Sequence, residues 1–498
     1  MMRHLLLTGL VGGVLAGGAL AAEPKGMFAQ FLGVNQGYPK PEGPDRYLTS
    51  YRQDLPWGDL QPEGPGKWNE QYLADWGKAV LEHRKFGAER MPVLLYTTGW
   101  AARKKAWSFT VAGKRYDVQA WAPGQDVNTR QATVTDLATG KVENSKLDAG
   151  RMPPEKVGDW EAYVERVVSF LSRPPYNVRY FQIWNEANDV GLTGFWNGTM
   201  DDYMETIHLP AAKIIRRHGG KVVYGGYPCN GSMEHYLGIL DKHRAWDTLD
   251  VLDIHYFPLS AWQCLYDRVS RDKRRLAIWQ TEVGFVPTPI WVPNSYPRFF
   301  HWAISHDWKP DRYKFFQFAS WSPDDPKAYG YNCNFYRGET LTFHGKALMT
   351  LGGLLEAPVV KPYTAWETWP RVKTEIDEGK SSVEGFDCGD RIVLAIHLAD
   401  QNGAAMFTDW ANGGDSLPMD SPEAKLEVQF PKLKPAAIKA VWKVGVYGSK
   451  APLAVKPGAG GKGVVVEVPP FDRDPVERQD NRDGRMHTFY LLVEKAGR

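Results

Sequence analysis

Cysteine is scarce in this sequence, which holds only four in 498 residues, and no two of them form a C-x-x-C pair. This spacing excludes the common zinc-binding patterns, so we expect no metal site and no cofactor. The first three fall in segments that we expect to be loops on one face of the fold, and an exported protein can form a disulfide between two of them. The sequence does not say which; the four are Cys229, Cys264, Cys333 and Cys388.

An excess of charge of either sign is also lacking, because 60 Lys and Arg residues balance 58 Asp and Glu residues. A formal net charge of +2 gives no basic footprint of the kind that nucleic-acid-binding proteins carry. Internal repeats and low-complexity tracts are absent. With 43% hydrophobic residues, the composition is that of a globular protein, and the length predicts two domains.

Long apolar runs are missing everywhere except near the start, where residues 5–22 follow Arg3. This run has the length of a membrane anchor, but its five glycines and the small-x-small site Ala19-Leu20-Ala21 are typical of a cleaved signal peptide. We therefore predict a signal peptide over residues 1–21, no membrane span, and a secreted or periplasmic protein.

Aromatic residues are abundant, with 20 Trp, 23 Tyr and 21 Phe. They fill large cores, and their flat faces also suit sugar rings. Short apolar runs alternate with helical segments over residues 28–355, which predicts a parallel (β/α)₈ TIM barrel. The expected strands are residues 28–35, 48–54, 91–97, 178–184, 221–226, 251–257, 275–282 and 314–321.

Two segments depart from a plain barrel. Only about a dozen residues separate the first two strands, so the first helix must be very short. Residues 101–150 are too long for a connection and are rich in turn signals, which predicts a hairpin insertion overhanging the barrel mouth. After residue 360 the pattern becomes short strands without helices. We therefore predict a catalytic barrel over residues 22–360 and a β-sandwich over residues 361–498.

Polar residues end several of the predicted strands, where active sites of such barrels lie. Glu186 follows strand four and Glu282 ends strand seven, 96 residues apart. Three βα units of a barrel span about 94 residues, so the two carboxylates should face each other across one mouth. Retaining glycosidases need such a pair about 5–5.5 Å apart, as acid/base and nucleophile. Taken singly, Glu186 is equally a helix-capping carboxylate and Glu282 an ion-pair partner of Arg52.

The segments "IWNEAN" (183–188) and "WQTEVGF" (279–285) resemble the corresponding motifs of clan A retaining glycoside hydrolases. The chain looks most like family 39 and is also similar to families 51 and 30. The resemblance implies that Glu186 is the general acid/base and Glu282 the nucleophile. It further implies that Asn185 binds a sugar hydroxyl, that Arg52 keeps the nucleophile charged and that Trp321 is a platform under the reacting sugar. His255 and Tyr256, at the end of strand six, complete the implied substrate-binding set.

One of these positions departs from the family pattern. Many relatives have His-x-Tyr at the end of strand six, with the Tyr touching the nucleophile, whereas this chain has His255-Tyr256-Phe257. Strand alternation would send His255 and Tyr256 to opposite faces. A β-bulge would restore the contact; otherwise it is missing or supplied elsewhere.

The expected function is hydrolysis of O-glycosidic bonds in a polysaccharide or oligosaccharide by double displacement, with endo action favoured by the long insertion. An exo-acting β-xylosidase-like enzyme, transglycosylation, and a non-catalytic carbohydrate-binding protein on the same scaffold stay open, as does the oligomeric state. Loop aromatics that serve equally as sugar subsites or as core are Trp57, Trp100, Trp262 and Trp291.

Overall fold

The structure is a computed structural model. It describes residues 25–40, 42–122, 125, 130–189, 195–285, 291–327, 333–369, 382–399, 426–468 and 486–497. The predicted signal peptide, residues 1–21, lies outside the described residues. Within the described ranges, no helix has both the length and the hydrophobicity needed to cross a membrane.

Eight parallel strands close into a barrel, as the alternating pattern predicts. The ring closes because β9 pairs with β11 and β13 pairs with β1, and the short β10 (Tyr227–Pro228) extends the pairing at β11. The barrel strands are β1 (Leu32–Asn35), β2 (Ser50–Pro56), β3 (Glu89–Leu95), β8 (Tyr180–Ile183), β9 (Lys221–Val223), β11 (Val251–His255), β12 (Ala277–Val283) and β13 (Tyr313–Phe318).

The first strand is shorter than predicted. Residues 28–31, expected to be strand, belong to helix α1 (Met27–Phe31), and β1 begins only at Leu32. Phe28 and Phe31 are spaced for one helical face and both pack against Phe300. A continuous apolar run does not distinguish a buried helix turn from a buried strand, so tertiary packing decides here.

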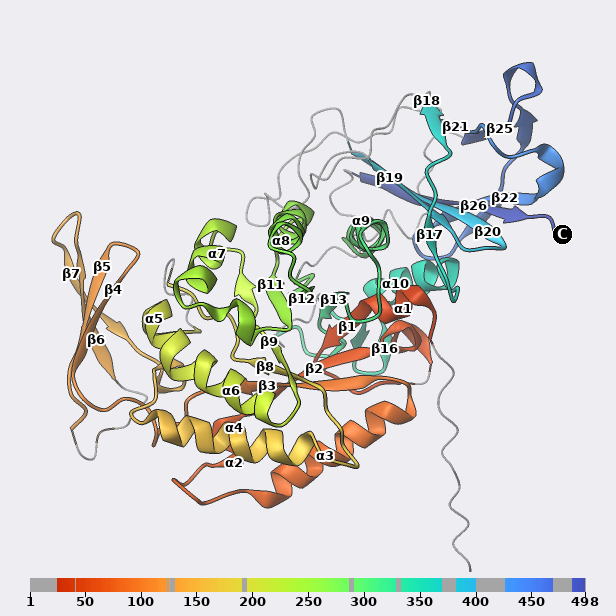
Figure 1. Cartoon of the computed structure of the whole chain (residues 1–498). Helices are drawn as coiled ribbons and strands as arrows, with labels where there is room; N and C mark the ends of the chain where they lie inside the picture. Colours follow the sequence, from red (N-terminus) through yellow and green to blue (C-terminus); the bar gives the residue numbers. More distant parts are fainter. Residues whose placement is uncertain are drawn as a thin grey trace, which may run out of the picture.

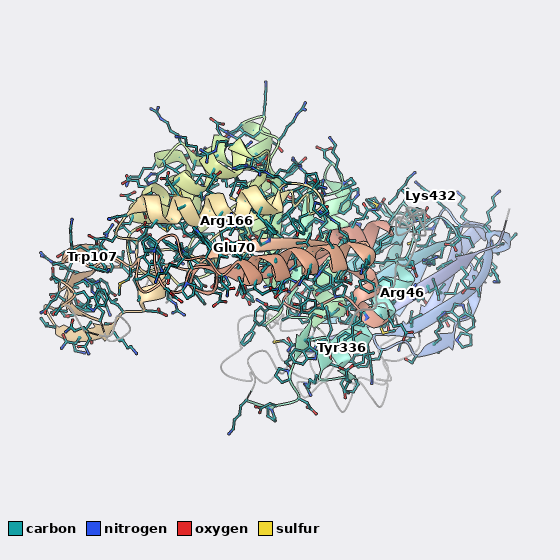
Figure 2. The ribbon with its side chains drawn as sticks, turned by 90° about the horizontal axis from the view of Figure 1, so that it is seen from below. Arg46, Glu70, Trp107, Arg166, Tyr336 and Lys432 are labelled. Atoms are coloured by element: carbon teal, nitrogen blue, oxygen red, sulfur yellow. The ribbon has the colours of Figure 1, made fainter. Side chains whose placement is uncertain are left out.

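Helices surround the barrel (Figure 1). The predicted first helix is indeed very short, a single 3₁₀ turn over Gly43–Tyr47. On the lower side of Figure 1, α3 (Glu70–Lys85) and α4 (Val157–Leu171) run next to each other, and an ion pair between Arg166 and Glu70 joins them (Figure 2). The other helices are α2 (Trp57–Leu60), α5 (Met200–Tyr203), α6 (Leu209–Arg217), α7 (Met233–Lys242), α8 (Leu259–Arg271), α9 (Trp291–Ser305) and α10 (Phe343–Leu354).

The insertion after β3 is an antiparallel meander with its own small core. Its first turn has Gly113 at φ 73°, a conformation that glycine adopts without strain. The sheet projects to one side of the barrel in Figure 1, and Trp107 marks it in Figure 2. Its strands are β4 (Trp107–Val111), β5 (Lys114–Val118), β6 (Gln131–Asp136) and β7 (Val142–Lys146).

The described residues of the C-terminal part form two antiparallel sheets, which confirms the prediction of a β domain after the barrel. Apolar side chains from both sheets form one core. One sheet contains β17 (Lys361–Pro362), β19 (Ser382–Asp387), β20 (Arg391–Ala399), β26 (Met486–Lys495), β22 (Ile438–Gly445) and β23 (Lys450–Pro452). The other contains β18 (Glu367–Trp369), β21 (Leu426–Phe430), β25 (Val464–Val468) and β24 (Val455–Pro457). The boundary at residue 360 stays a prediction.

The two domains meet where α9 of the barrel packs on β19. Phe300 stacks on Phe386 with ring centroids 5.8 Å apart. Arg298 donates to Ser382 and lies 3.9 Å from the Glu384 carboxylate. The interface therefore combines apolar contact with one buried ion pair.

The cysteines do not form the disulfide that the sequence left open. All four lie in the described residues, and no S–S bond joins any two of them. Cys264 is not in a loop, because it lies within helix α8.

Candidate active site

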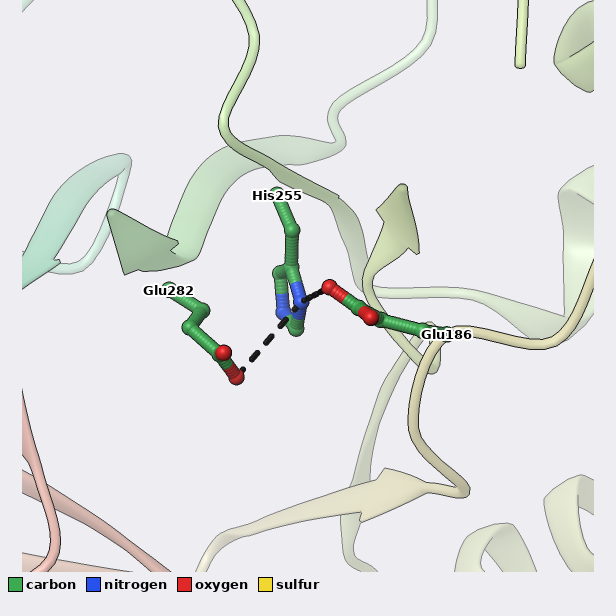
Figure 3. A group of neighbouring side chains, drawn as sticks. All are labelled: Glu186, His255 and Glu282. Carbon is green, nitrogen blue, oxygen red and sulfur yellow. Dashed lines mark hydrogen bonds and ion pairs between the residues drawn. The ribbon is translucent and has the colours of Figure 1, made fainter. Parts of the chain in front are cut away.

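The barrel brings Glu186 and Glu282 together at the mouth, with His255 between them (Figure 3). Each of the three offers one ligand-type atom, and these atoms lie within 4.8 Å of one another. Both carboxylates are almost buried, with Glu186 8% and Glu282 9% exposed. Two carboxyl groups at this separation match the spacing of about 5–5.5 Å that retaining glycosidases use.

Glu186 is positioned by an irregular turn after β8. Trp184 has φ 70° and Glu186 has φ 50°, left-handed values that cost non-glycine residues roughly 1–2 kcal/mol each. The backbone N–H of Trp184 donates to Leu94, and that of Glu186 donates to Gly225 at 2.7 Å. Because neighbouring strands hold the turn on both sides, the carboxylate points across the mouth instead of continuing the strand.

Glu282 lies on β12 and receives a hydrogen bond or ion pair at each carboxylate oxygen. Arg52 Nη1 lies 3.1 Å from Oε2, and the Tyr256 hydroxyl donates to Oε1 at 2.8 Å. Burial raises the pKa of Glu282 above its ordinary value, while His255, Arg52 and the Tyr256 hydroxyl oppose that rise and the charge of Glu186 adds to it. These donors are what a buried carboxylate needs to stay ionised.

A β-bulge, which the sequence left open, brings both His255 and Tyr256 to the site. Asp253 pairs with Trp279, but His255 pairs with Glu282, so β12 carries one extra residue there. Tyr256 then takes φ 58°. Consecutive residues that a regular strand would send to opposite faces therefore both contact the glutamates.

Arg52 is held by its whole guanidinium group. Its Nε donates to Gln182 at 2.6 Å and its Nη2 donates to Asn185 at 2.6 Å, while Nη1 lies 3.5 Å from Asn35 Oδ1. The planar fork is thus fixed in the orientation that faces Glu282. Gln182 and Asn35 were missed from the sequence, although each is a polar residue within a predicted buried strand, which is itself a signal.

His255 is fully buried and is surrounded by carboxylates. Its Nδ1 lies 2.9 Å from Glu186 Oε1 and 3.7 Å from Glu282 Oε2, and its Nε2 lies 3.0 Å from Thr281 Oγ1. Burial alone would lower the pKa of this imidazole, but Asp253, Glu186 and Glu282 overcome the effect and raise the pKa to about 9. An imidazolium therefore lies between the two glutamates at neutral pH.

The cluster of Glu186, His255 and Glu282 is the one group with metal-ligand spacing in the described part of the chain. The contacts favour another use. His255 Nδ1 contacts Glu186, and Arg52 already supplies a positive charge to Glu282. A divalent cation would have to displace the first contact and would be repelled by the guanidinium and imidazolium charges.

The tryptophans that were predicted to bind sugar differ in how exposed they are. Trp321 lies on β14 (Trp321–Ser322), beyond the end of β13, is 45% exposed and donates to the carbonyl of Gly338. Its role as a sugar platform stays a prediction. Among the loop aromatics, Trp100 is partly buried, whereas three are core residues rather than subsites, because burial leaves no face for a ligand: Trp57, Trp262 and Trp291.

No protein-family model matches the chain, and no curated protein sequence is significantly similar to it. The solved structures that share its fold include two glycoside hydrolases. A family 39 glycoside hydrolase from the gut symbiont Bacteroides cellulosilyticus WH2 has a TM-score of 0.50 at 14% identity, over 95% of this chain and 83% of that chain. A GH30 endoxylanase from Clostridium papyrosolvens C71 has a TM-score of 0.50 at 12% identity, over 95% of this chain and 98% of that chain. This chain is thus similar in fold to glycoside hydrolases of families 39 and 30.

Proposed function

We propose that this protein is a retaining glycoside hydrolase. The observation that carries the proposal is the pair of nearly buried glutamates whose carboxylate oxygens lie within 4.8 Å of each other at the barrel mouth. That spacing suits a nucleophile and an acid/base on one glycosidic bond and leaves no room for the water that an inverting enzyme places between them.

In the first step, Glu282 attacks the anomeric carbon while Glu186 gives its proton to the departing glycosidic oxygen. Arg52 and Tyr256 donate to Glu282 and hold it as the ionised nucleophile. The product is a glycosyl–Glu282 ester and a free leaving-group sugar. In the second step, Glu186 takes a proton from water, and the resulting hydroxide attacks the anomeric carbon and releases Glu282.

Asn185 is proposed to contact the sugar hydroxyl next to the reacting carbon. Its Oδ1 accepts from Arg52 at 2.6 Å, which directs the amide nitrogen away from the guanidinium. Such a contact strengthens as the oxocarbenium-like transition state forms.

The proposed substrate is a polysaccharide cut at internal bonds outside the cytoplasm. The sequence of residues 1–21 supports export, and the insertion β4–β7 beside the barrel supports an extended substrate. The GH30 neighbour is named an endoxylanase, which favours the same mode. Exo action on oligosaccharides is the second candidate, since an insertion of this kind also closes off pockets.

The test is a comparison of residues 22–498 with the Glu282→Gln variant on β-linked polysaccharides and aryl glycosides, with product lengths and anomeric configuration recorded. Oligosaccharides released by the natural sequence alone, with retained configuration, support the proposal in full. Monosaccharides alone favour exo action. Inverted products, or full activity in Glu282→Gln, would falsify the mechanism.

A further inference from the structure

A third carboxylate, Asp253, lies beneath the two glutamates. It is on β11, is 0% exposed, and sits two residues before His255. Its Oδ1 accepts from the Thr281 backbone N–H at 2.9 Å. Its Oδ2 accepts from the Thr281 hydroxyl at 2.6 Å and from Gln182 Nε2 at 2.5 Å. A group that accepts three hydrogen bonds in the interior has the bonding of an ionised carboxylate.

The first arm of this network leads from Asp253 to the proposed nucleophile. Gln182 gives its Nε2 to Asp253, which leaves its Oε1 facing Arg52 Nε at 2.6 Å. If the Gln182 amide were flipped, its nitrogen would face the donor Arg52 Nε and its oxygen would face the acceptor Asp253 Oδ2. Asp253 and the Tyr224 carbonyl, which accepts from the same nitrogen at 3.2 Å, together fix the orientation of Gln182 and, through it, of the guanidinium that lies 3.1 Å from Glu282.

The second arm leads to the proposed acid/base. Because the Thr281 hydroxyl gives its hydrogen to Asp253, its oxygen accepts from His255 Nε2 at 3.0 Å. His255 Nε2 therefore carries a hydrogen. Its Nδ1 lies 2.9 Å from Glu186 Oε1, and the raised pKa of the ring gives Nδ1 a hydrogen to donate there as well. With both ring nitrogens donating, the ring is an imidazolium, and Asp253 Oδ2 is its countercharge at 3.7 Å from Nε2.

We infer that Asp253 is a positioning residue that orients both cations of the site, Arg52 through Gln182 and His255 through Thr281. The inference rests on the proposed function of the two glutamates. Asp253 does not touch the substrate. It keeps His255 protonated, so that Nδ1–H is directed at Oε1 of Glu186.

Several charged or titratable groups surround His255, and each bears on its protonation. Glu186 after β8 and Glu282 on β12 favour the cation, and Asp253 on its own strand does so as well. The remaining groups are Arg52 on β2, which binds Glu282, Tyr236 in α7, which lies near Asp253, and Tyr256, which donates to Glu282. Of these, Asp253 is the one carboxylate with no proposed chemical role.

The experiment measures the titration of His255 by ¹⁵N NMR in residues 22–498, without substrate. His255→Gln identifies its signals among those of the other histidines. In the natural sequence the ring should stay an imidazolium to a pH of about 9. In Asp253→Asn it should lose its proton at least about one pH unit lower, because its countercharge is gone. Asp250→Asn is the matched control, since Asp250 contacts Val222 N and Arg216 outside this network.

A second variant, Thr281→Val, keeps Asp253 and removes only the hydroxyl that links it to His255, and it replaces Asp253→Asn if that variant does not fold. It should also lower the pH at which His255 loses its proton. Where hydrolysis is observed, the alkaline limb of kcat/KM should move with the NMR value. An unchanged titration in the folded variants overturns the inference. A lowered titration in a chain that hydrolyses no glycoside supports Asp253 and counts against the proposed function instead.

Discussion

Arg52 Nη1 lies 3.1 Å from Glu282 Oε2, although the two residues are 230 positions apart in the chain. This pair is buried, and three further oxygen acceptors fix the guanidinium. A lysine keeps the positive charge but replaces a rigid fork by one mobile ammonium group. We expect Arg52→Lys to lower kcat about 10²–10³-fold, measured on the substrate that the activity screen identifies.

The control for this variant is Arg46→Lys, which alters an exposed pair between Arg46 and Glu356. Exposed pairs of this kind contribute about 0–1 kcal/mol, so activity and stability should change little. Equal activity of Arg52→Lys and Arg46→Lys would remove Arg52 from the site.

Tyr256→Phe should lower kcat about 10–100-fold, because a hydrogen bond to a charged group contributes about 1.5–3 kcal/mol. The lost hydroxyl donates to Glu282 Oε1 at 2.8 Å. Tyr227→Phe is the matched control, since among the described residues the Tyr227 hydroxyl has no hydrogen-bond partner. Steady-state kinetics that show the same loss in both variants would contradict a specific role for Tyr256.

Glu186→Gln should affect substrates according to their leaving groups. Poor leaving groups need the proton, so cleavage of natural glycosides should fall about 10²–10⁴-fold, whereas formation of the glycosyl ester from activated aryl glycosides should be nearly unchanged. Pre-steady-state release of the aryl group measures that step. The control is Glu205→Gln, which changes an exposed glutamate in the helix Met204–His208. A uniform loss across leaving groups would argue against the acid role.

Gly226→Ala should displace the His255 ring, because the new methyl group would occupy the space next to it. Gly226 has φ 65°, and a Cβ there would lie 2.0 Å from His255 Nε2. Gly219 has a similar φ of 74° with open space around it, so Gly219→Ala measures the backbone strain alone, about 1–2 kcal/mol. We expect Gly226→Ala to cost about 1–3 kcal/mol more in urea unfolding and to reduce activity. Similar costs for both variants would show that His255 adapts without loss.

Stability should decline between about pH 5 and pH 8 because of Glu384. Burial raises the pKa of Glu384 to about 7 from the ordinary 4.5, against the opposing charge of Arg298. A raised carboxyl pKa favours the protonated fold, so the contribution is full below pH 4.5 and is lost as the pH rises through 7. The expected loss is on the order of 3 kcal/mol.

Thermal unfolding at several pH values, with Glu384→Gln beside the natural sequence, measures this effect. The variant should flatten the decline, whereas Glu367→Gln, which changes an exposed glutamate of the same domain, should leave it intact. A decline that persists in Glu384→Gln would assign it to another group.

The barrel and the two glutamates were predictable because they rest on regular features. Eight apolar runs at nearly even spacing predict the strands, and the 96-residue interval from Glu186 to Glu282 follows from them. The two sheets after residue 360 are predicted by the same reasoning, because apolar and polar residues alternate along their strands and turns separate the strands.

What the sequence did not predict depends on local deviations from those patterns. The place of Tyr256 is decided by one extra residue in β12 and a left-handed φ, which leave no mark in residue periodicity. Gln182, Asp253 and Thr281 are single polar residues inside apolar strands, and only three-dimensional closure shows that they face one another. The start of β1 was predicted wrongly because a continuous apolar run fits either a helix or a strand.

The buried charges at the mouth have a consequence for the order of events in catalysis. Arg52 and the His255 imidazolium supply two positive charges, while Asp253, Glu186 and Glu282 supply three carboxyl groups. A low-dielectric interior favours neutrality, which this set reaches by retaining one additional proton. In the proposed reaction one proton leaves this set with the leaving group and one returns from water. The net charge of the buried set is therefore the same at the end of each cycle as at its start.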